Sequence, residues 1–165
     1  QLLRVNPTTM DTELIFNTLL SNRKRLVQIL DDTPENMLSE VPEGFNNNIW
    51  WNMAHTLVVQ QLLCYKLSGL PMYVGEGLIR DYSKGTFPGD LPDLQVRQEV
   101  SQTLVRTVDH LKADYNAGKF RSYHAYTTSA GVTLRTIEDG LHFNLYHEGL
   151  HMGTIQALLK VGRQG

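Results

Sequence analysis

The spacing of apolar residues along the chain is the feature that most limits its fold. Over four long segments these residues recur every three or four positions, which is the period of an amphipathic helix. The pattern predicts helices over about 8–32, 47–68, 92–117 and 136–161. Each segment ends close to a helix-stopping residue, in turn Pro34, Gly69, Gly118 and Gly162. No stretch has the sustained alternation typical of β-strands, so the sequence predicts an all-α protein.

The connection from Gly69 to Leu91 limits how these helices can be arranged. Helices of about 22 to 25 residues are about 35 Å long, a length typical of four-helix bundles. The connection is far longer than a tight turn, and its extended reach exceeds the length of such a bundle. The helices at 47–68 and 92–117 can therefore run parallel, joined by an overhand crossover, while shorter links are consistent with antiparallel neighbours. We expect one domain over residues 1–165, built as a four-helix bundle.

The overall composition excludes several classes of protein. With 41% hydrophobic and 19% charged residues, the 165-residue chain is typical of a single globular domain. A formal net charge of -2 gives no basic field for a nucleic-acid backbone, and no apolar run approaches the roughly 20 residues that span a bilayer. The only cysteine, Cys64, cannot form an internal disulfide, which favours a reducing compartment. We therefore expect a cytoplasmic protein; whether a removed leader precedes residue 1 stays open.

Three histidines at helical positions are the strongest indication of chemistry. His147 and His151 stand four residues apart in the helix at 136–161, so both can point at one atom. His55 lies in the helix at 47–68. Imidazole is a common ligand of zinc, nickel, copper and iron, and three such ligands leave positions open for water or substrate. The spacing therefore indicates a reactive metal site rather than a closed structural one.

The helical wheel places each of these histidines on a mostly apolar stripe, together with residues such as Trp51 and Leu150. A buried imidazole needs partners for both nitrogens, and inward-turned imidazoles can share a cation through one nitrogen each. The nearest polar side chains for the other nitrogens are Asn52, Asn144 and Thr154. On spacing alone, an ordinary set of hydrogen-bonded core histidines is an equal alternative. We expect surface or capping roles for the remaining histidines, His110, His124 and His142.

The run His147-Glu148-x-x-His151 also matches the signature of zinc peptidases, in which the glutamate is a general base. The usual extension needs glycine and histidine where this chain has Thr154 and Ala157. The other common pattern takes a glutamate well downstream, and no acidic residue follows His151. Glu148 is about 100° from His147 on the helical wheel, where an interhelical hydrogen bond can hold it. A metallopeptidase is therefore the less favoured alternative.

With these motifs in place, the chain resembles the DinB-like superfamily, a group of small bacterial four-helix bundles. The resemblance spans nearly the whole chain and rests on Trp50-Trp51-Asn52-x-x-His55 and Tyr146-His147-Glu148-x-x-His151-x-Gly153-x-Ile155. It implies an up-down-down-up bundle, in agreement with the long crossover. It also implies one divalent metal, nickel or zinc before iron or manganese, with water completing the shell. The positions that match the family's ligands are His55, His147 and His151.

The resemblance implies less about the reaction. Relatives include transferases and isomerases that use low-molecular-weight thiols such as bacillithiol or mycothiol, and many members have no known substrate. We therefore expect a metal-dependent enzyme of thiol S-transferase or hydrolase type that acts on a small molecule. The alternative is a non-catalytic stress-response module that binds metal or another ligand. Cys64 is expected on the face of its helix opposite His55, which argues against a cysteine nucleophile.

The helix at 47–68 is apolar nearly all round, which gives an expectation about assembly. Besides the stripe that carries His55, it has a second apolar face formed by Met53, Leu57, Cys64 and Leu67. A helix of this kind must be covered on both sides, either by the crossover or by a second subunit. Because twofold pairing is the commonest assembly, we expect a homodimer formed through this helix.

Overall fold

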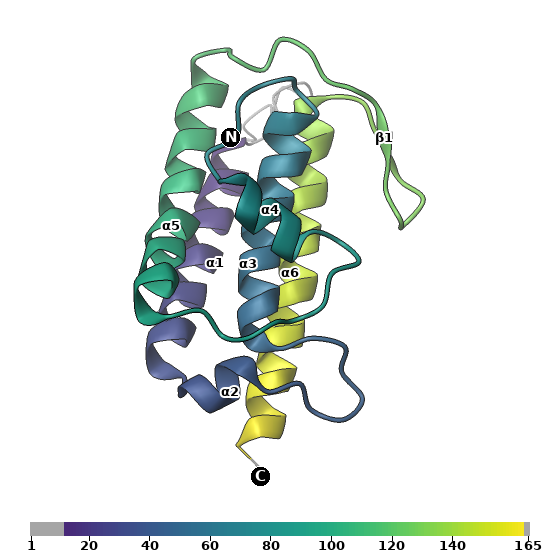
Figure 1. Ribbon diagram of the computed structural model, residues 1–165. Helices are drawn as coiled ribbons and strands as arrows, with labels where there is room; N and C mark the ends of the chain where they lie inside the picture. Colours follow the sequence, from purple (N-terminus) through teal and green to yellow (C-terminus); the bar gives the residue numbers. More distant parts are fainter. Residues whose placement is uncertain (1–11, 164–165) are drawn as a thin grey trace, which may run out of the picture.

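A computed structural model describes residues 12–163 and is mainly helical, as the sequence predicts. The long helices are α1 (Thr12–Asp32), α3 (Ile49–Gln61) with its π-helical continuation η1 (Leu62–Lys66), α5 (Leu94–Asn116) and α6 (Ile137–Gly162). Figure 1 shows these helices side by side; α6 packs against both α1 and α3, and α5 packs against α1. None of the helices in residues 12–163 combines the length and the apolar character needed to cross a bilayer.

Capping side chains set three of the predicted helix starts. Thr136 and Asp139 form a capping box at the start of α6, in which each side chain accepts a hydrogen bond from the other residue's backbone N–H. Asn48 and Asp93 cap α3 and α5, each accepting a backbone N–H from the first turn. The predicted start of the first helix, at Thr8, lies outside the described residues.

The structure adds short elements that the sequence pattern does not predict. Helix α2 (Glu35–Ser39) follows α1, and α4 (Glu76–Tyr82) lies within the long crossover. Strands β1 (Tyr126–Thr127) and β2 (Thr133–Leu134) pair in antiparallel fashion as a small hairpin before α6. Strands of two residues are too short to show alternation, and a one- or two-turn helix is too short to show a helical period. The all-α prediction holds apart from this hairpin.

Helix α3 is covered on both faces by the chain itself. The side chains of Met53, Leu57 and Cys64 are 0% exposed. Met53 and Leu57 belong to a hydrophobic cluster shared by the long helices, and Val74 and Leu78 of the crossover pack against that cluster. The second apolar face therefore needs no other subunit to cover it. The homodimer stays a prediction, but the observation that suggested it has another explanation.

Candidate metal centre

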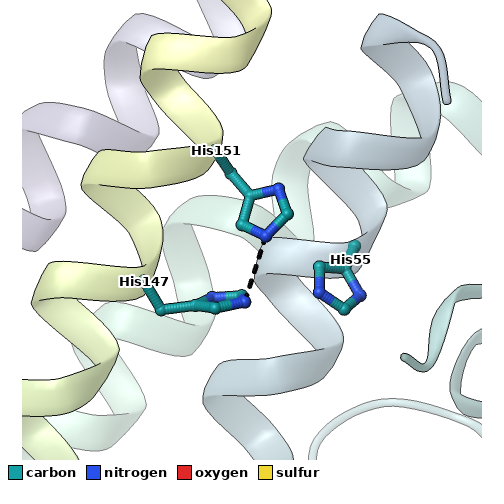
Figure 2. A group of neighbouring side chains, drawn as sticks. All are labelled: His55, His147 and His151. Atoms are coloured by element: carbon teal, nitrogen blue, oxygen red, sulfur yellow. Dashed lines mark hydrogen bonds between the residues drawn. The ribbon is translucent and has the colours of Figure 1, made fainter. Parts of the chain in front are cut away.

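The packing of α3 against α6 brings the three predicted histidines together. His55 projects from α3, and His147 and His151 project from successive turns of α6 (Figure 2). One ring nitrogen of each lies within 4.8 Å of the other two, and the Nε2 atoms of His147 and His151 are 3.1 Å apart. His55 is 5% exposed, and the other two histidines are half-buried. Three imidazoles thus surround one point at the border between core and surface.

Hydrogen bonds to neighbouring acceptors fix the tautomers of two of these rings. His151 Nδ1 lies 2.7 Å from Asn52 Oδ1. The orientation of the Asn52 amide is set, because its Nδ2 donates to two other oxygens at 2.8 and 2.7 Å, which leaves Oδ1 as the acceptor. His55 Nδ1 lies 2.7 Å from the carbonyl oxygen of Tyr82, which can only accept. Both rings therefore donate through Nδ1 and keep a lone pair on Nε2.

Burial keeps all three imidazoles neutral near pH 7. Loss of solvation is the largest cause that lowers the pKa of His147 to about 4 and the pKa of His151 to about 3, and neighbouring imidazoles add to it. Burial also lowers the pKa of His55, against a smaller opposing effect of its hydrogen bond to the Tyr82 carbonyl. The Trp51 ring stacks on His55, with ring centroids 4.4 Å apart. Neutral imidazoles are the form that a metal ion requires of histidine ligands.

The arrangement fits a divalent transition-metal ion. Two nitrogens about 2.1 Å from one ion, at angles of about 90° to 109°, lie about 3.0 to 3.4 Å apart. The 3.1 Å between the Nε2 atoms of His147 and His151 falls in this range, whereas the whole set, within 4.8 Å, is more open. Asn52 and the Tyr82 carbonyl are the outer acceptors that metal-bound imidazoles ordinarily have. His147 differs, because its Nδ1 is buried without a hydrogen-bond partner among residues 12–163.

Glu148, the residue next to His147, has a structural role. Its carboxylate is 1% exposed and forms an ion pair with Arg23 of α1, with an Nη2–Oε1 distance of 2.7 Å. Asn22 and Asn144 donate further hydrogen bonds to it at 3.0 and 3.1 Å. The predicted interhelical hydrogen bond is thus confirmed. Because this carboxylate is committed to Arg23 and does not line the pocket beside the histidines, it is not available as the general base of a peptidase.

The buried face of α6 is rotated from the predicted one. Leu150, which the sequence pattern places in the core stripe, is 52% exposed, whereas Glu148 is buried. The reason is Arg23, which is fully buried on α1 and requires a carboxylate opposite it. Turning Glu148 inward leaves His147 and His151 at the edge of the helix interface, where they border a pocket.

The pocket beside the histidines has a volume of about 580 Å³. Its walls come from α3, η1, α6, the crossover after α4 and the β1–β2 hairpin, through His55, Val59, Leu62, Leu63, Lys66, Leu67, Lys84, Tyr126, Thr128, Ser129, Phe143, His147 and His151. Single π-helical turns such as η1 often occur at functional sites. Cys64 is absent from this lining and fully buried, and burial raises the pKa of its thiol. The structure therefore supports the prediction that this cysteine is not a nucleophile.

Two consecutive tryptophans hold the crossover against α3. Trp50 Nε1 donates to Tyr82 Oη at 2.7 Å, and Trp51 Nε1 donates to Thr86 Oγ1 at 3.0 Å. With the bond between His55 and the Tyr82 carbonyl, these contacts fix the segment after α4 beside the site. A glycine-rich connection has no period that predicts which of its residues contact α3. In the sequence, the tryptophan pair and the tyrosine within the connection are the residues that could indicate this contact.

Of the three polar side chains predicted to contact the histidines, only Asn52 does so. Asn144 donates instead to Glu148. Thr154 Oγ1 donates to the Leu150 carbonyl of its own helix at 3.1 Å. Both lie on the predicted stripe, but the rotation of α6 gives them other partners.

The remaining histidines stay apart from the site. His142 is exposed on α6, and His124 is exposed in the loop before β1, as predicted. His110 is a correction: it is half-buried, its ring centroid lies 4.1 Å from that of Tyr73, and its Nδ1 is buried. The long crossover carries Tyr73 onto α5, which the helical wheel alone does not reveal.

A search of the curated proteins found no match to this chain. A comparison with protein families did find one, because the model of the DinB superfamily matches residues 18–155. This range contains all three histidines of the cluster and well over half of the sequence. The chain belongs to the DinB superfamily.

Proposed function

We propose that this protein binds a divalent metal ion through His55, His147 and His151 and uses it as an open catalytic centre for thiol transfer or hydrolysis. The observation that carries the proposal is the convergence of three neutral imidazoles beside a pocket of about 580 Å³. Membership of the DinB superfamily and the fixed tautomers of His55 and His151 support it. Zinc or nickel suits an all-imidazole ligand set best, and iron or manganese less well.

When bound, an ion with three protein ligands supplies a Lewis acid that lowers the pKa of a thiol or water in its open positions. The residues of the chain bind the ion and orient the imidazole rings. Asn52 and the Tyr82 carbonyl hold two of the imidazole rings in the tautomer that presents Nε2. The apolar walls of the pocket limit the water around a bound substrate. Because Cys64, the single cysteine of the sequence, does not line the pocket, we assign the nucleophilic sulfur of thiol transfer to a low-molecular-weight thiol that enters the pocket.

An up-down-down-up four-helix bundle is part of the same proposal. The side-by-side packing of α1, α3, α5 and α6 supports it, and so does the long connection between η1 and α5. In such a bundle the crossover passes over one side, where hydrogen bonds from Trp50 and Trp51 hold it.

A non-catalytic module that binds metal or a ligand is the second candidate. One observation favours it: no carboxylate of residues 12–163 lines the pocket, and Glu148 is paired with Arg23. A reaction that needs a carboxylate for general acid–base catalysis therefore has no such group at the site. The two candidates differ in whether a bound small molecule is chemically changed.

Turnover by zinc- or nickel-loaded protein separates these candidates. A panel of alkylating agents and esters is incubated with the protein, each with and without a small thiol such as cysteine. We expect metal-dependent consumption of at least one electrophile, lost in His151→Ala and retained in His142→Ala, which removes an exposed histidine of the same helix. No turnover by the metal-loaded protein with any pair, or equal turnover by His151→Ala, would contradict the enzymatic role.

A further inference from the structure

Within the described residues, the two formally charged side chains that line the histidine pocket are both positive. Lys66 lines it from η1, and Lys84 lines it from the crossover just after α4. In the described part of the chain, no acidic side chain lines the pocket. Neither lysine has an ion-pair partner within residues 12–163. The pocket therefore has positive charge without a compensating negative group, even before a metal ion adds to it.

Most of the remaining wall is apolar and strengthens this field. Val59, Leu62, Leu63 and Leu67 line the side formed by α3 and η1, and Phe143 lines the side formed by α6. Charges at the edge of an apolar cavity act through less water than charges on an open surface, so their attraction for an anion is larger. A well-matched ligand offers an apolar body to these walls and a negative group to the lysines.

The two lysines approach the pocket from different parts of the fold. Lys84 follows the segment whose Tyr82 carbonyl lies 2.7 Å from His55 Nδ1, so its backbone is held near the histidines. Two separate segments of the chain thus each contribute one lysine to the wall of the pocket.

We propose that this pocket binds a small organic carboxylate with an apolar body, held by Lys66 and Lys84. The inference deepens the proposed function and rests on it only in treating the carboxylate as substrate or thiol co-substrate. Binding of the anion by the lysines does not itself require the metal. The chemistry that recognises the ligand is therefore separable from the chemistry that would transform it.

Two matched probes test the charge preference. 4-Phenylbutyrate and its neutral amide, 4-phenylbutanamide, share the same apolar body and differ in the charged group. Their dissociation constants are measured by NMR titration at low ionic strength, with zinc-loaded and with chelator-treated protein, and the indole N–H signals of Trp50 and Trp51 serve as reporters beside the site. We expect the carboxylate to bind about tenfold more tightly than the amide in both preparations, and the difference to shrink as salt is added.

Lysine variants assign that preference to its source. The double variant Lys66→Gln with Lys84→Gln is expected to bind the amide as the parent does and to lose most of the preference for the carboxylate. Lys24→Gln, which removes an exposed lysine of α1 away from the pocket, is the control for net charge and is expected to keep the preference. Equal binding of the two probes, no saturable binding of either, or an unchanged preference in the double variant would overturn the proposal.

Zinc content measured on the same samples keeps the two proposals distinct. If the protein binds zinc but shows no lysine-dependent preference for the carboxylate over the amide, only the proposal of an anion pocket is contradicted. A chain that retains the preference after chelation but takes up no zinc contradicts the proposed metal centre and leaves the anion pocket standing.

Discussion

Two polar clusters lie next to each other on α6, because His147 of one and Glu148 of the other are consecutive residues. They differ in what their polar side chains bind. In the Arg23–Glu148 cluster, the guanidinium binds the carboxylate and also donates to the Leu104 carbonyl, while Asn22 completes the carboxylate's hydrogen bonds. The cluster joins helices and faces the core. In the histidine cluster, by contrast, nitrogens face one another beside a pocket, and His147 Nδ1 has no partner in the described part of the chain.

The difference separates a structural group from a candidate site. The Arg23 guanidinium and the Glu148 carboxylate bind each other, so the pair stabilises the fold and cannot bind another ligand. In the histidine cluster, His151 Nε2 accepts a hydrogen bond from His147 Nε2 at 3.1 Å, whereas the Nε2 lone pair of His55 has no donor among the described residues. Such an arrangement is stabilised by a ligand, which we propose is a metal ion. Substitutions in the two clusters should therefore act on different properties.

Arg23→Met is expected to cause the largest loss of stability. It leaves the buried Glu148 carboxylate without its cation, at a cost of about 3 to 5 kcal/mol in the free energy of unfolding. Arg25→Met, at an exposed position on the same helix, is the matched control and should change that free energy by less than about 0.5 kcal/mol. Urea denaturation measures both variants. Equal, small effects would mean that the buried pair is not the structural cluster described above.

A compensating substitution sharpens this result. Adding Glu148→Leu to Arg23→Met removes the unpaired charge, so the double variant should recover much of the lost stability. Its zinc content should match that of the parent, because neither residue lines the histidine pocket. Loss of zinc from a folded double variant would show that the two clusters are coupled.

Asn52→Ala is expected to weaken the metal site without removing a ligand. The substitution deletes the acceptor that holds His151 Nδ1–H, and loss of such an outer partner typically lowers metal affinity by about 10- to 100-fold. Thr154→Ala is the control, because its hydroxyl donates only to the Leu150 carbonyl, one helical turn from His151. Competition with a chromophoric zinc chelator gives both affinities. An equal effect of the two substitutions on zinc affinity would show that Asn52 does not orient His151.

Trp51→Phe is expected to have the smallest effect and to loosen the crossover. It keeps an aromatic ring against His55 but removes the N–H that donates to Thr86, which is worth about 1 kcal/mol. A double-mutant cycle with Thr86→Val isolates that bond, and hydrogen exchange of residues 82–86 reports the loosening. Additive effects of the two substitutions would show that this hydrogen bond does not hold the crossover.

The elements that the sequence predicts well are those whose signals are local. The capping box at Thr136 and the helical period locate α6, and the four-residue spacing of His147 and His151 places both on one face. Arg23 had a local signal as well, since it lies four residues after Leu19 and three before Leu26 on the buried stripe of α1. Arg23 also belongs to the basic run Arg23-Lys24-Arg25, and because such runs usually face solvent, the pattern does not predict that Arg23 is buried.

The parts that the sequence does not predict depend on contacts between distant segments. The Tyr82 carbonyl that orients His55 is a backbone atom in a glycine-rich connection, so no residue type identifies it. Lys84 lies at the pocket because hydrogen bonds from Trp50, Trp51 and His55 hold that connection against α3. The rotation of α6 follows from the partner of Glu148 on another helix, which a single helical wheel cannot include.

Metal content of protein prepared without a metal-affinity tag tests the central claim most directly. After incubation with zinc or nickel and removal of free ion, mass spectrometry should find about one ion per chain in the parent and in His142→Ala, and little in His151→Ala. Far-UV circular dichroism should be the same for all three, because His151 is not a core side chain. A parent protein that takes up neither metal, or a His151→Ala variant that binds as much as the parent, would contradict the three-histidine centre.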